Sequence, residues 1–296
     1  MADIQPRERA VCDVCLESGT TLVRKYTRGP WPVVSCRGCG FVFLGRVPDY
    51  DDLSVTLAWE KQFADEKERR RKSRWFTRFD SLTRFRLKLG KLIDRARHAR
   101  VAPLAGRVLE IGCGGSTRIP EGPTPYGIEI SEGLFERARP IFEARGGTVH
   151  HAPATAGIER FPESFFDAII MRSYLEHEAQ PRLVLERAFT CLKPGGRILL
   201  RSPNYNSINR QVMGAEWCGF RFPDHVNYFT PRSLGKLARS IGYEFKWKNR
   251  FSLFDDNLIV ELIKPTAEVA SPAASPLGGG ASRGAPPGGP ASPEPV

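Results

Sequence analysis

The sequence predicts an α/β fold with a doubly wound, mostly parallel sheet, preceded by a small cysteine-rich module and a basic helical segment. Three observations predict it. Short apolar strands alternate with helix-like segments from residue 101 to residue 264, which is the pattern of a parallel sheet covered on both faces. A glycine-rich run directly follows the first of these strands. Four of the seven cysteines form two close pairs near the start of the chain.

Length and composition agree with a globular, cytoplasmic protein. The chain has 296 residues, and 41% of them are apolar, which is enough for a sizeable core and too many for a wholly disordered chain. No apolar run reaches the roughly 18 to 20 residues that span a bilayer. The first residues also lack the apolar stretch of a secretory signal. We therefore expect a cytoplasmic chain without a transmembrane segment.

The paired cysteines indicate a zinc ribbon over residues 8–48. They form a C-x2-C pair, a gap of 20 residues and a second C-x2-C pair, made by Cys12, Cys15, Cys36 and Cys39. Two such pairs let four thiolates converge on one tetrahedral Zn²⁺, which would be structural because no coordination position stays open. Gly40 supplies the backbone freedom of the second turn. We expect strands at 21–26 and 33–35, and four metal-free thiols are the alternative.

The positive charge is concentrated in one segment. The formal net charge is +11, and residues 60–100 contain 15 Lys and Arg against 6 Asp and Glu. Apolar residues recur there at steps of three and four, which predicts a helical connector or lid over 55–100. It either packs its apolar side on the α/β domain or binds an anionic partner. The tail at 265–296 has 8 Pro and 6 Gly and is expected to be disordered.

The first two strands carry the candidate ligand-binding residues. A strand at 107–111 runs into the glycines of a short loop, where the backbone can approach a ligand closely. A second strand at 125–130 ends beside Glu129, which follows Glu110 by 19 residues. A carboxylate at that strand tip can accept hydrogen bonds from two ribose hydroxyls.

The remaining elements continue the alternation. Helices are expected at 131–144, with Ser131 as the N-cap, and at 181–192 and 231–242. Strands are expected at 165–171 and 197–201, with a turn at 193–196 before the second of them. An antiparallel hairpin of 245–251 with 257–264 closes the pattern.

Several of these segments together resemble class I S-adenosylmethionine-dependent methyltransferases. The resemblance covers residues 101–264 and is carried by Glu110-Ile-Gly-Cys-Gly114, Gly127-Ile-Glu-Ile-Ser131, Phe165-Phe-Asp167, Leu175-Glu-His177 and Leu192-Lys-Pro-Gly-Gly196. It implies a Rossmann-like sheet of seven strands. It also implies S-adenosylmethionine as cofactor, held by Glu110, Gly112, Cys113, Gly114, Glu129 and Ile130. Two departures are Ser116 in place of a third glycine and the absence of an acid at 152–155 for the adenine amine.

Two histidines are candidates for removing a proton from the methyl acceptor, because the pKa of histidine lies near working pH. His225 is preferred, since it lies in the long segment after the strand expected at 197–201. His177 follows the strand expected at 165–171, at the carboxyl edge of the sheet where ligands bind, and Glu176 is expected to orient it. For each histidine the alternative is a purely structural contact.

The acceptor class follows from the branch of the family that the chain resembles. An N-terminal zinc ribbon and the Pro223-Asp-His225 segment resemble bacterial enzymes that modify sugars, polysaccharides, quinones and secondary metabolites. We expect a small-molecule, sugar or glycan-type acceptor that is methylated on oxygen. A phosphorylated or nucleotide-linked acceptor is one form of this expectation. An RNA methyltransferase is the alternative, although Arg172-Ser-Tyr-Leu175 replaces the Asn-Pro-Pro-Tyr type of motif. A non-catalytic interaction protein with a degenerate fold is the third hypothesis.

Overall fold

The computed structural model describes residues 7–48, 103–250 and 255–266. The basic connector predicted over 55–100 and nearly all of the tail predicted over 265–296 lie outside these residues. Within them, no helix has both the length and the apolar character that crossing a membrane requires.

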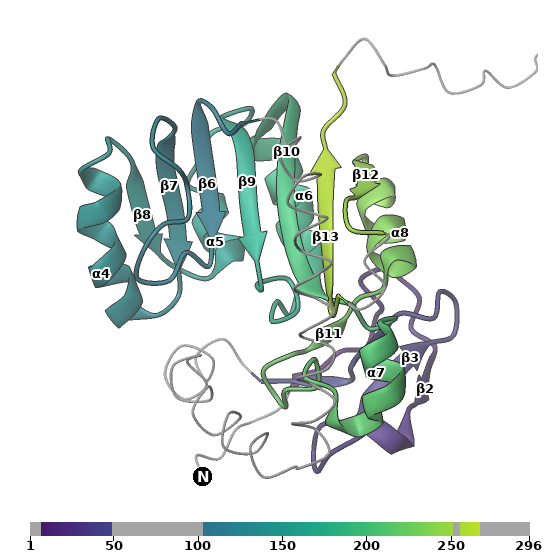
Figure 1. The fold of residues 1–296 in the computed structure, drawn as a ribbon. Coiled ribbons are helices and arrows are strands. Elements are labelled where there is room, and N and C mark those ends of the chain that lie inside the picture. The colour runs from purple at the N-terminus through teal and green to yellow at the C-terminus, as the bar shows by residue number, and fades with distance from the viewer. Residues whose placement is uncertain (1–6, 49–102, 251–254, 267–296) are drawn as a thin grey trace, which may run out of the picture.

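A seven-stranded sheet forms the centre of the molecule (Figure 1). Its strand order is β12-β13-β10-β9-β6-β7-β8; the five strands from β10 to β8 are mutually parallel, and β13 runs antiparallel to both of its neighbours. The strands are β6 (Arg107–Ile111), β7 (Thr124–Glu129), β8 (Thr148–His151), β9 (Phe166–Arg172), β10 (Leu192–Pro203), β12 (Glu244–Trp247) and β13 (Asn257–Ile263). The predicted mostly parallel, seven-stranded sheet is confirmed.

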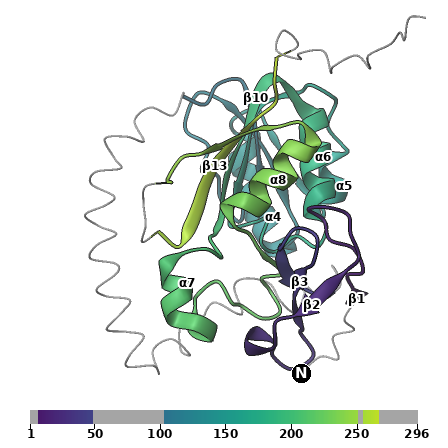
Figure 2. The same cartoon turned by 90° about the vertical axis from the view of Figure 1, so that its right-hand side faces the viewer.

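Helices cover both faces of this sheet. They are α4 (Glu132–Glu143), α5 (Ala154–Ile158), α6 (Pro181–Cys191) and α8 (Pro231–Ile241). Helices α5, α6 and α8 lie side by side on one face (Figure 2), over the largest cluster of buried apolar side chains. Helix α4 packs on the other face at β7 and β8, where a Cβ on Gly127 would lie 2.9 Å from the Phe142 ring. This two-sided cover is what a parallel sheet requires.

The structure corrects several predicted boundaries. Strand β8, which contains His150 and His151, and helix α5 were not predicted. Ser131 does precede α4, but its side chain makes no capping hydrogen bond. Strand β10 includes the predicted turn, with an irregular register between Leu192 and Arg197. The hairpin of β12 with β13 is antiparallel as predicted but shorter.

The N-terminal residues build a second, smaller sheet. Its order is β11-β4-β3-β2, and the edge strand β11 comes from the segment after β10. Its strands are β2 (Thr20–Leu22), β3 (Val33–Cys36), β4 (Val42–Leu44) and β11 (Asn227–Tyr228), and the 3₁₀ helix η1 (Arg24–Tyr26) lies between β2 and β3. The short strands β1 (Arg7–Glu8) and β5 (Arg46–Val47) pair with each other in a separate antiparallel ladder. The strand predicted over 21–26 is therefore wrong beyond Leu22. We call residues 7–48 and 204–230 together the cysteine lobe; its other helices are α7 (Ile208–Met213) and η2 (Gly214–Glu216).

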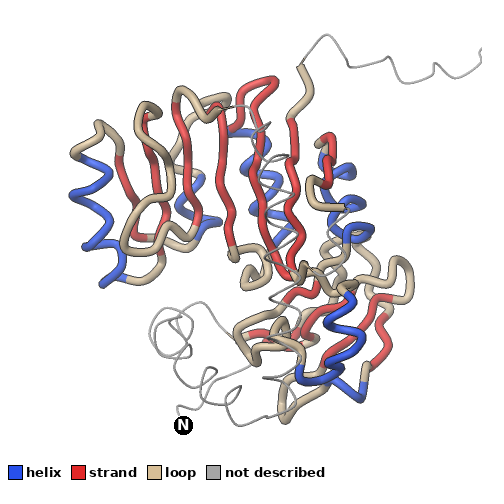
Figure 3. The backbone as a smooth tube through the Cα atoms, in the orientation of Figure 1, coloured by secondary structure: helices blue, strands red, loops and turns tan. Residues whose placement is uncertain are grey.

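The cysteine lobe lies at the carboxyl edge of the parallel strands. In Figure 1 the arrowheads of β6, β7 and β9 point toward the side of the sheet that faces this lobe, and Figure 3 shows the helices in blue and the strands in red in the same view. Inside the lobe, aromatic side chains from both of its segments are buried together, namely Tyr26, Trp217, Phe220 and Tyr228. The structure places these four in the core.

Candidate active site

The four paired cysteines converge as their spacing predicts. The Sγ atoms of Cys12 and Cys39 are 3.6 Å apart, those of Cys15 and Cys36 are 3.4 Å apart, and all four lie within 4.8 Å of one another. A tetrahedral zinc with bonds of about 2.3 Å needs sulfur–sulfur separations of about 3.8 Å. The four side chains therefore fit a structural Zn²⁺.

The two cysteine turns share one backbone geometry. Leu16 follows the first pair with φ of 66°, and Gly40 follows the second with φ of 73°. The Leu16 N–H donates to the Cys12 carbonyl at 2.7 Å, and the Gly40 N–H donates to the Cys36 carbonyl at 2.9 Å. Sequence reasoning identified the second of these turns from its glycine. In the first turn it did not identify Leu16 as the residue with a positive φ, because leucine rarely adopts that conformation.

The glycine loop, residues 112–118, directly follows β6 and is hydrogen-bonded to the end of β7. Gly112 and Gly114 have φ of 68° and 69°, and the Gly112 N–H donates to the Ile128 carbonyl at 2.9 Å. The Glu129 carboxylate accepts hydrogen bonds from the Gly114 N–H at 2.8 Å and from the Ser131 N–H at 2.9 Å. A Cβ on Gly114 would have no heavy atom within 4 Å. The loop therefore presents bare backbone to open space beside a fixed carboxylate.

Below this loop the predicted acid Glu110 is almost fully buried, with 1% of its surface exposed. Its carboxylate accepts hydrogen bonds from the Arg118 N–H at 3.0 Å, the Thr117 hydroxyl at 3.2 Å and the Arg118 guanidinium at 3.2 Å. Burial raises the pKa of the Cys113 thiol, and the carboxylates of Glu129 and Glu110 raise it further. Cys113 is therefore a neutral packing residue.

Ile130, the last residue predicted to hold the cofactor, is half-buried directly after β7. Its carbonyl lies 2.9 Å from Nε2 of His151 in β8. The side chains of this edge thus fit the ribose and methionine parts of S-adenosylmethionine, whereas residues 152–155 supply no acid for its adenine amine.

The loop after β9 brings the histidines to the same edge. It begins at Ser173, whose φ is 51°, and its next residue, Tyr174, packs on the glycine loop. A Cβ on Gly112 would lie only 3.1 Å from the Tyr174 ring. The His177 N–H donates to the Tyr174 carbonyl at 2.9 Å. Tyr174 therefore connects the predicted cofactor residues to the predicted catalytic residues.

His177 and His225 lie against each other, with their ring centroids 4.6 Å apart in an edge-to-face arrangement. His177 Nδ1 donates to the Asp224 carboxylate at 2.8 Å, and His225 Nδ1 donates to the Gly219 carbonyl at 2.9 Å. Because both acceptors lack a proton, each neutral ring carries its hydrogen on Nδ1 and leaves Nε2 free to take one. The predicted orientation of His177 by Glu176 is corrected, since Asp224 makes that bond.

The surroundings separate the two histidines electrostatically. Burial lowers the pKa of His177, but the charge and hydrogen bond of Asp224 outweigh it and raise this pKa above its ordinary value. Burial raises the pKa of Asp224, yet the His177 charge and hydrogen bond lower it to about 2. Burial, and then the charge of His177, lower the pKa of His225 well below its ordinary value. His177 therefore favours its charged form more strongly than His225 does.

Glu176 lies beside the two rings and is 1% exposed. One ligand atom from each of Glu176, His177 and His225 lies within 4.8 Å of the others. Burial raises the pKa of Glu176, and its Oε2 has no hydrogen-bond partner in the part of the chain that the structure describes. The three predicted catalytic residues are therefore gathered in one place.

Asn227 holds this group to the cysteine lobe. Its side-chain amide donates to the carbonyls of Leu175 at 2.9 Å and Glu178 at 2.6 Å, and its backbone N–H donates to the Glu176 carbonyl at 3.0 Å. Arg9, three residues before Cys12, donates to Asn227 Oδ1 at 2.9 Å. Sequence reasoning missed the roles of both Asp224 and Asn227, although they flank His225 in the chain.

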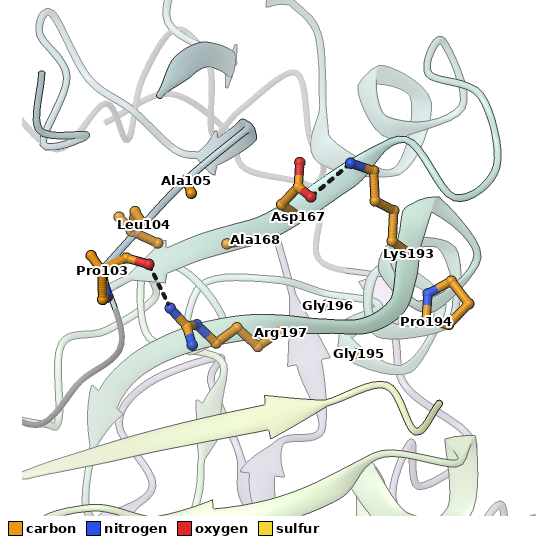
Figure 4. A pocket seen from close by; sticks show the side chains of 10 residues that line it. All are labelled: Pro103, Leu104, Ala105, Asp167, Ala168, Lys193, Pro194, Gly195, Gly196 and Arg197. Carbon is orange, nitrogen blue, oxygen red and sulfur yellow. Dashed lines mark hydrogen bonds and ion pairs between the residues drawn. The ribbon is translucent and has the colours of Figure 1, made fainter. Parts of the chain in front are cut away.

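A separate cavity of about 280 Å³ lies at the opposite, amino-terminal edge of the sheet (Figure 4). Asp167 at this edge accepts hydrogen bonds from Lys193 Nζ at 2.6 Å and from the Arg107 N–H at 2.8 Å. The family-like segments at 165–167 and 192–196 therefore tie strands together at that edge. Ligands of parallel sheets bind at the carboxyl edge, so we place the active site there.

Known proteins match the same part of the chain. The sequence profile of the methyltransferase domain family matches residues 75–246. The ubiquinone biosynthesis O-methyltransferase of Thiobacillus denitrificans is 31% identical over 157 residues, which span 48% of this chain and 67% of that protein. The protein of the same name from Pseudomonas fluorescens strain Pf-5 is 30% identical, over 50% of this chain and 68% of its own length.

A solved structure described as a putative methyltransferase, from Bacillus halodurans, is 15% identical and aligns with a TM-score of 0.46, over 60% of this chain and all of its own. The family profile covers more than half of the chain and includes the glycine loop and both strands beside it. This protein therefore belongs to the methyltransferase domain family and is a class I S-adenosylmethionine-dependent methyltransferase.

Proposed function

We propose that this enzyme transfers the methyl group to a hydroxyl of a small-molecule or sugar-type acceptor. The observation that carries the proposal is the contact of Tyr174 with Gly112, because it places the histidine pair beside the glycine loop at one sheet edge. Relatives named ubiquinone biosynthesis O-methyltransferase, at about 30% identity, support oxygen as the methylated atom and a small molecule as the acceptor.

Glu110, Gly112, Cys113, Gly114, Glu129 and Ile130 would hold S-adenosylmethionine in this proposal. Glu129 is the ribose partner, since its carboxylate is held at the tip of β7 by two backbone N–H groups. Gly114 leaves the space that a bound ligand needs. Bound there, the cofactor supplies a methyl group already activated by its sulfonium charge. The chain's remaining task is to align the acceptor and remove its proton.

His177 is the stronger candidate for that proton. Its side chain is 19% exposed, and Asp224 fixes the tautomer whose Nε2 is free. A carboxylate that holds an imidazole in this way also stabilises the imidazolium formed when the proton arrives. His225, with 5% exposure, is the second candidate, and Glu176 completes the group. The four cysteines would hold a structural Zn²⁺ that takes no part in the chemistry.

Transfer of labelled methyl groups tests the proposal. The purified chain is incubated with methyl-labelled S-adenosylmethionine and a panel of catechols, nucleotide sugars, lipid-linked glycans and RNA. We expect label in a hydroxyl-bearing small molecule, lost in the His177→Ala variant and kept in a control such as Arg232→Gln. Label in RNA alone would favour the nucleic-acid alternative. Failure to bind the cofactor in calorimetry would favour the non-catalytic one.

A further inference from the structure

Three arginines meet on the face of the sheet that also carries Glu110. Arg172 ends β9, and Arg201 lies directly opposite it in the parallel ladder of β9 and β10. The Ser173 N–H donates to the Arg201 carbonyl at 2.8 Å, which fixes the two strand ends together. Neighbouring strands are about 4.8 Å apart, so the two guanidinium groups start from adjacent positions on one face. Arg118 reaches the same place from the glycine loop.

Neither cross-strand arginine has a counter-ion among the residues that the structure describes. Arg172 and Arg201 are exposed, and neither makes a side-chain hydrogen bond or ion pair with another described residue. Burial lowers the pKa of Arg172, and the charges of Arg118 and Arg201 lower it further. The Glu110 carboxylate, which raises the pKa of Arg172, is already engaged by the backbone and guanidinium of Arg118. Among the described residues, Arg172 and Arg201 are therefore left without a carboxylate partner of their own.

Like charges opposite each other in a sheet are destabilising. Here they lie at the carboxyl edge, where a parallel sheet binds its ligands, and only two residues before the Tyr174 ring that packs on Gly112. If Arg172 and Arg201 were only solvated surface residues, nothing would require them to lie at this edge of the sheet. The pair lies where part of the acceptor must rest if its nucleophile is to approach the methyl group.

We propose that Arg172 and Arg201, supported by Arg118, bind a phosphoryl group of the methyl acceptor, so that the acceptor is a phosphate or diphosphate ester. The proposal rests on the proposed function. Each guanidinium binds an oxyanion through two parallel N–H groups. A carboxylate has two oxygens and satisfies one such fork, whereas a phosphoryl group offers three oxygens and can bridge two forks. The pair of forks therefore favours a phosphoryl group over a carboxylate.

Calorimetry on the full chain with S-adenosylhomocysteine already bound tests this. That ligand fills the cofactor site, so the cofactor's own carboxylate is present during the titration. The probes are inorganic pyrophosphate and uridine diphosphate. We expect both to bind, and Arg172→Gln and Arg201→Gln each to weaken binding by about tenfold or more, as loss of a charged hydrogen bond does. The affinity should also fall as salt rises.

Arg232→Gln is the matched control, since it removes one exposed, unpaired arginine from α8, which covers the other face of the sheet. It should leave the affinity for pyrophosphate unchanged. Absence of pyrophosphate binding to the wild-type chain would overturn the proposal. So would variants that bind S-adenosylhomocysteine more weakly and pyrophosphate normally, because the arginines would then serve the cofactor carboxylate. A wild-type chain that fails to bind S-adenosylhomocysteine at all would instead defeat the proposed function.

Discussion

The glycine loop and the cysteine lobe face each other across one sheet edge, but they are built in opposite ways. The glycine loop and its acid partners lie between Glu110 and Ser131, and backbone hydrogen bonds hold them together. The histidine pair depends on three segments far apart in the chain: the cysteine turns, the loop after β9 and the segment around β11. The first region should tolerate damage to the second, whereas the second should fail as a unit.

Preventing zinc from binding to the cysteine lobe should have the largest effect on one region and the smallest on the other. Structural zinc contributes folding free energy directly, and the lobe that the proposed zinc would hold supplies Arg9, β4 and the contacts of Asn227. We expect Cys12→Ser, or chelation, to lower methyl transfer by about 100-fold or more while the affinity for S-adenosylmethionine changes little. Metal analysis measures the bound zinc, calorimetry measures the affinity for S-adenosylmethionine, and transfer of labelled methyl groups measures turnover.

Cys218→Ser is the control for this prediction, because Cys218 lies outside the four-cysteine cluster. It should keep both the zinc and the turnover. If Cys12→Ser lost cofactor binding to the same extent as turnover, the two regions would form one folding unit and the contrast drawn above would be wrong.

The histidine pair gives the next largest effect. Loss of a general base lowers turnover by about 10²- to 10⁴-fold, and we expect this of His177→Ala with the affinity for S-adenosylmethionine unchanged. A base acts only when unprotonated, so turnover rises with pH through its pKa. With His177 as the base, whose pKa is raised, the midpoint lies above about 6.5. With His225 as the base, whose pKa is lowered, the midpoint lies well below that value.

The pH dependence of turnover at saturating substrate therefore decides between the rings. A midpoint above the ordinary histidine value that disappears in His177→Gln supports His177. A rate that stays constant down to acidic pH, with the large loss in His225→Gln, assigns the base to His225. Full turnover in both variants would exclude a histidine base.

Glu129→Gln tests the other side of the edge. The variant keeps the size of the side chain but removes the negative charge of the carboxylate that would accept hydrogen bonds from the ribose hydroxyls. Hydrogen bonds to charged groups contribute about 1.5 to 3 kcal/mol, so we expect about 10- to 100-fold weaker binding of S-adenosylmethionine in calorimetry. Turnover at saturating cofactor should change much less. Glu136→Gln, at a half-exposed site on α4, is the control, and an unchanged dissociation constant in Glu129→Gln would remove the ribose assignment.

The same contrast explains what could be predicted from the sequence. The glycine loop, the acid at the end of β7 and the cysteine pairs were predictable, because each is set by spacing within about 25 residues and by a backbone geometry that certain residue types favour. The pairing of β11 with β4 joins residues about 185 positions apart and has no local signal. His177 and Glu176 were identified, but their hydrogen bonds depend on that pairing. The partner of His177 was therefore assigned to its neighbour in sequence instead of to Asp224.

The smallest effect concerns the two cysteine turns, which are equivalent in geometry but not in sequence. Leu16 is 61% exposed and has a φ of 66°, so its side chain gains little from burial. The left-handed conformation costs an L-residue about 1 to 2 kcal/mol. Glycine avoids this cost, but it loses more conformational entropy on folding, so the net gain in stability is smaller. We expect Leu16→Gly to raise the free energy of unfolding by about 0.5 kcal/mol. Gly40→Leu should lower it by a similar amount, because nothing lies within 4 Å of a Cβ there. Urea unfolding of the zinc-loaded chain measures both changes. Equal shifts of opposite sign would show that the turns differ only in conformational strain, whereas a loss of stability in Leu16→Gly would mean that the leucine side chain makes a stabilising contact.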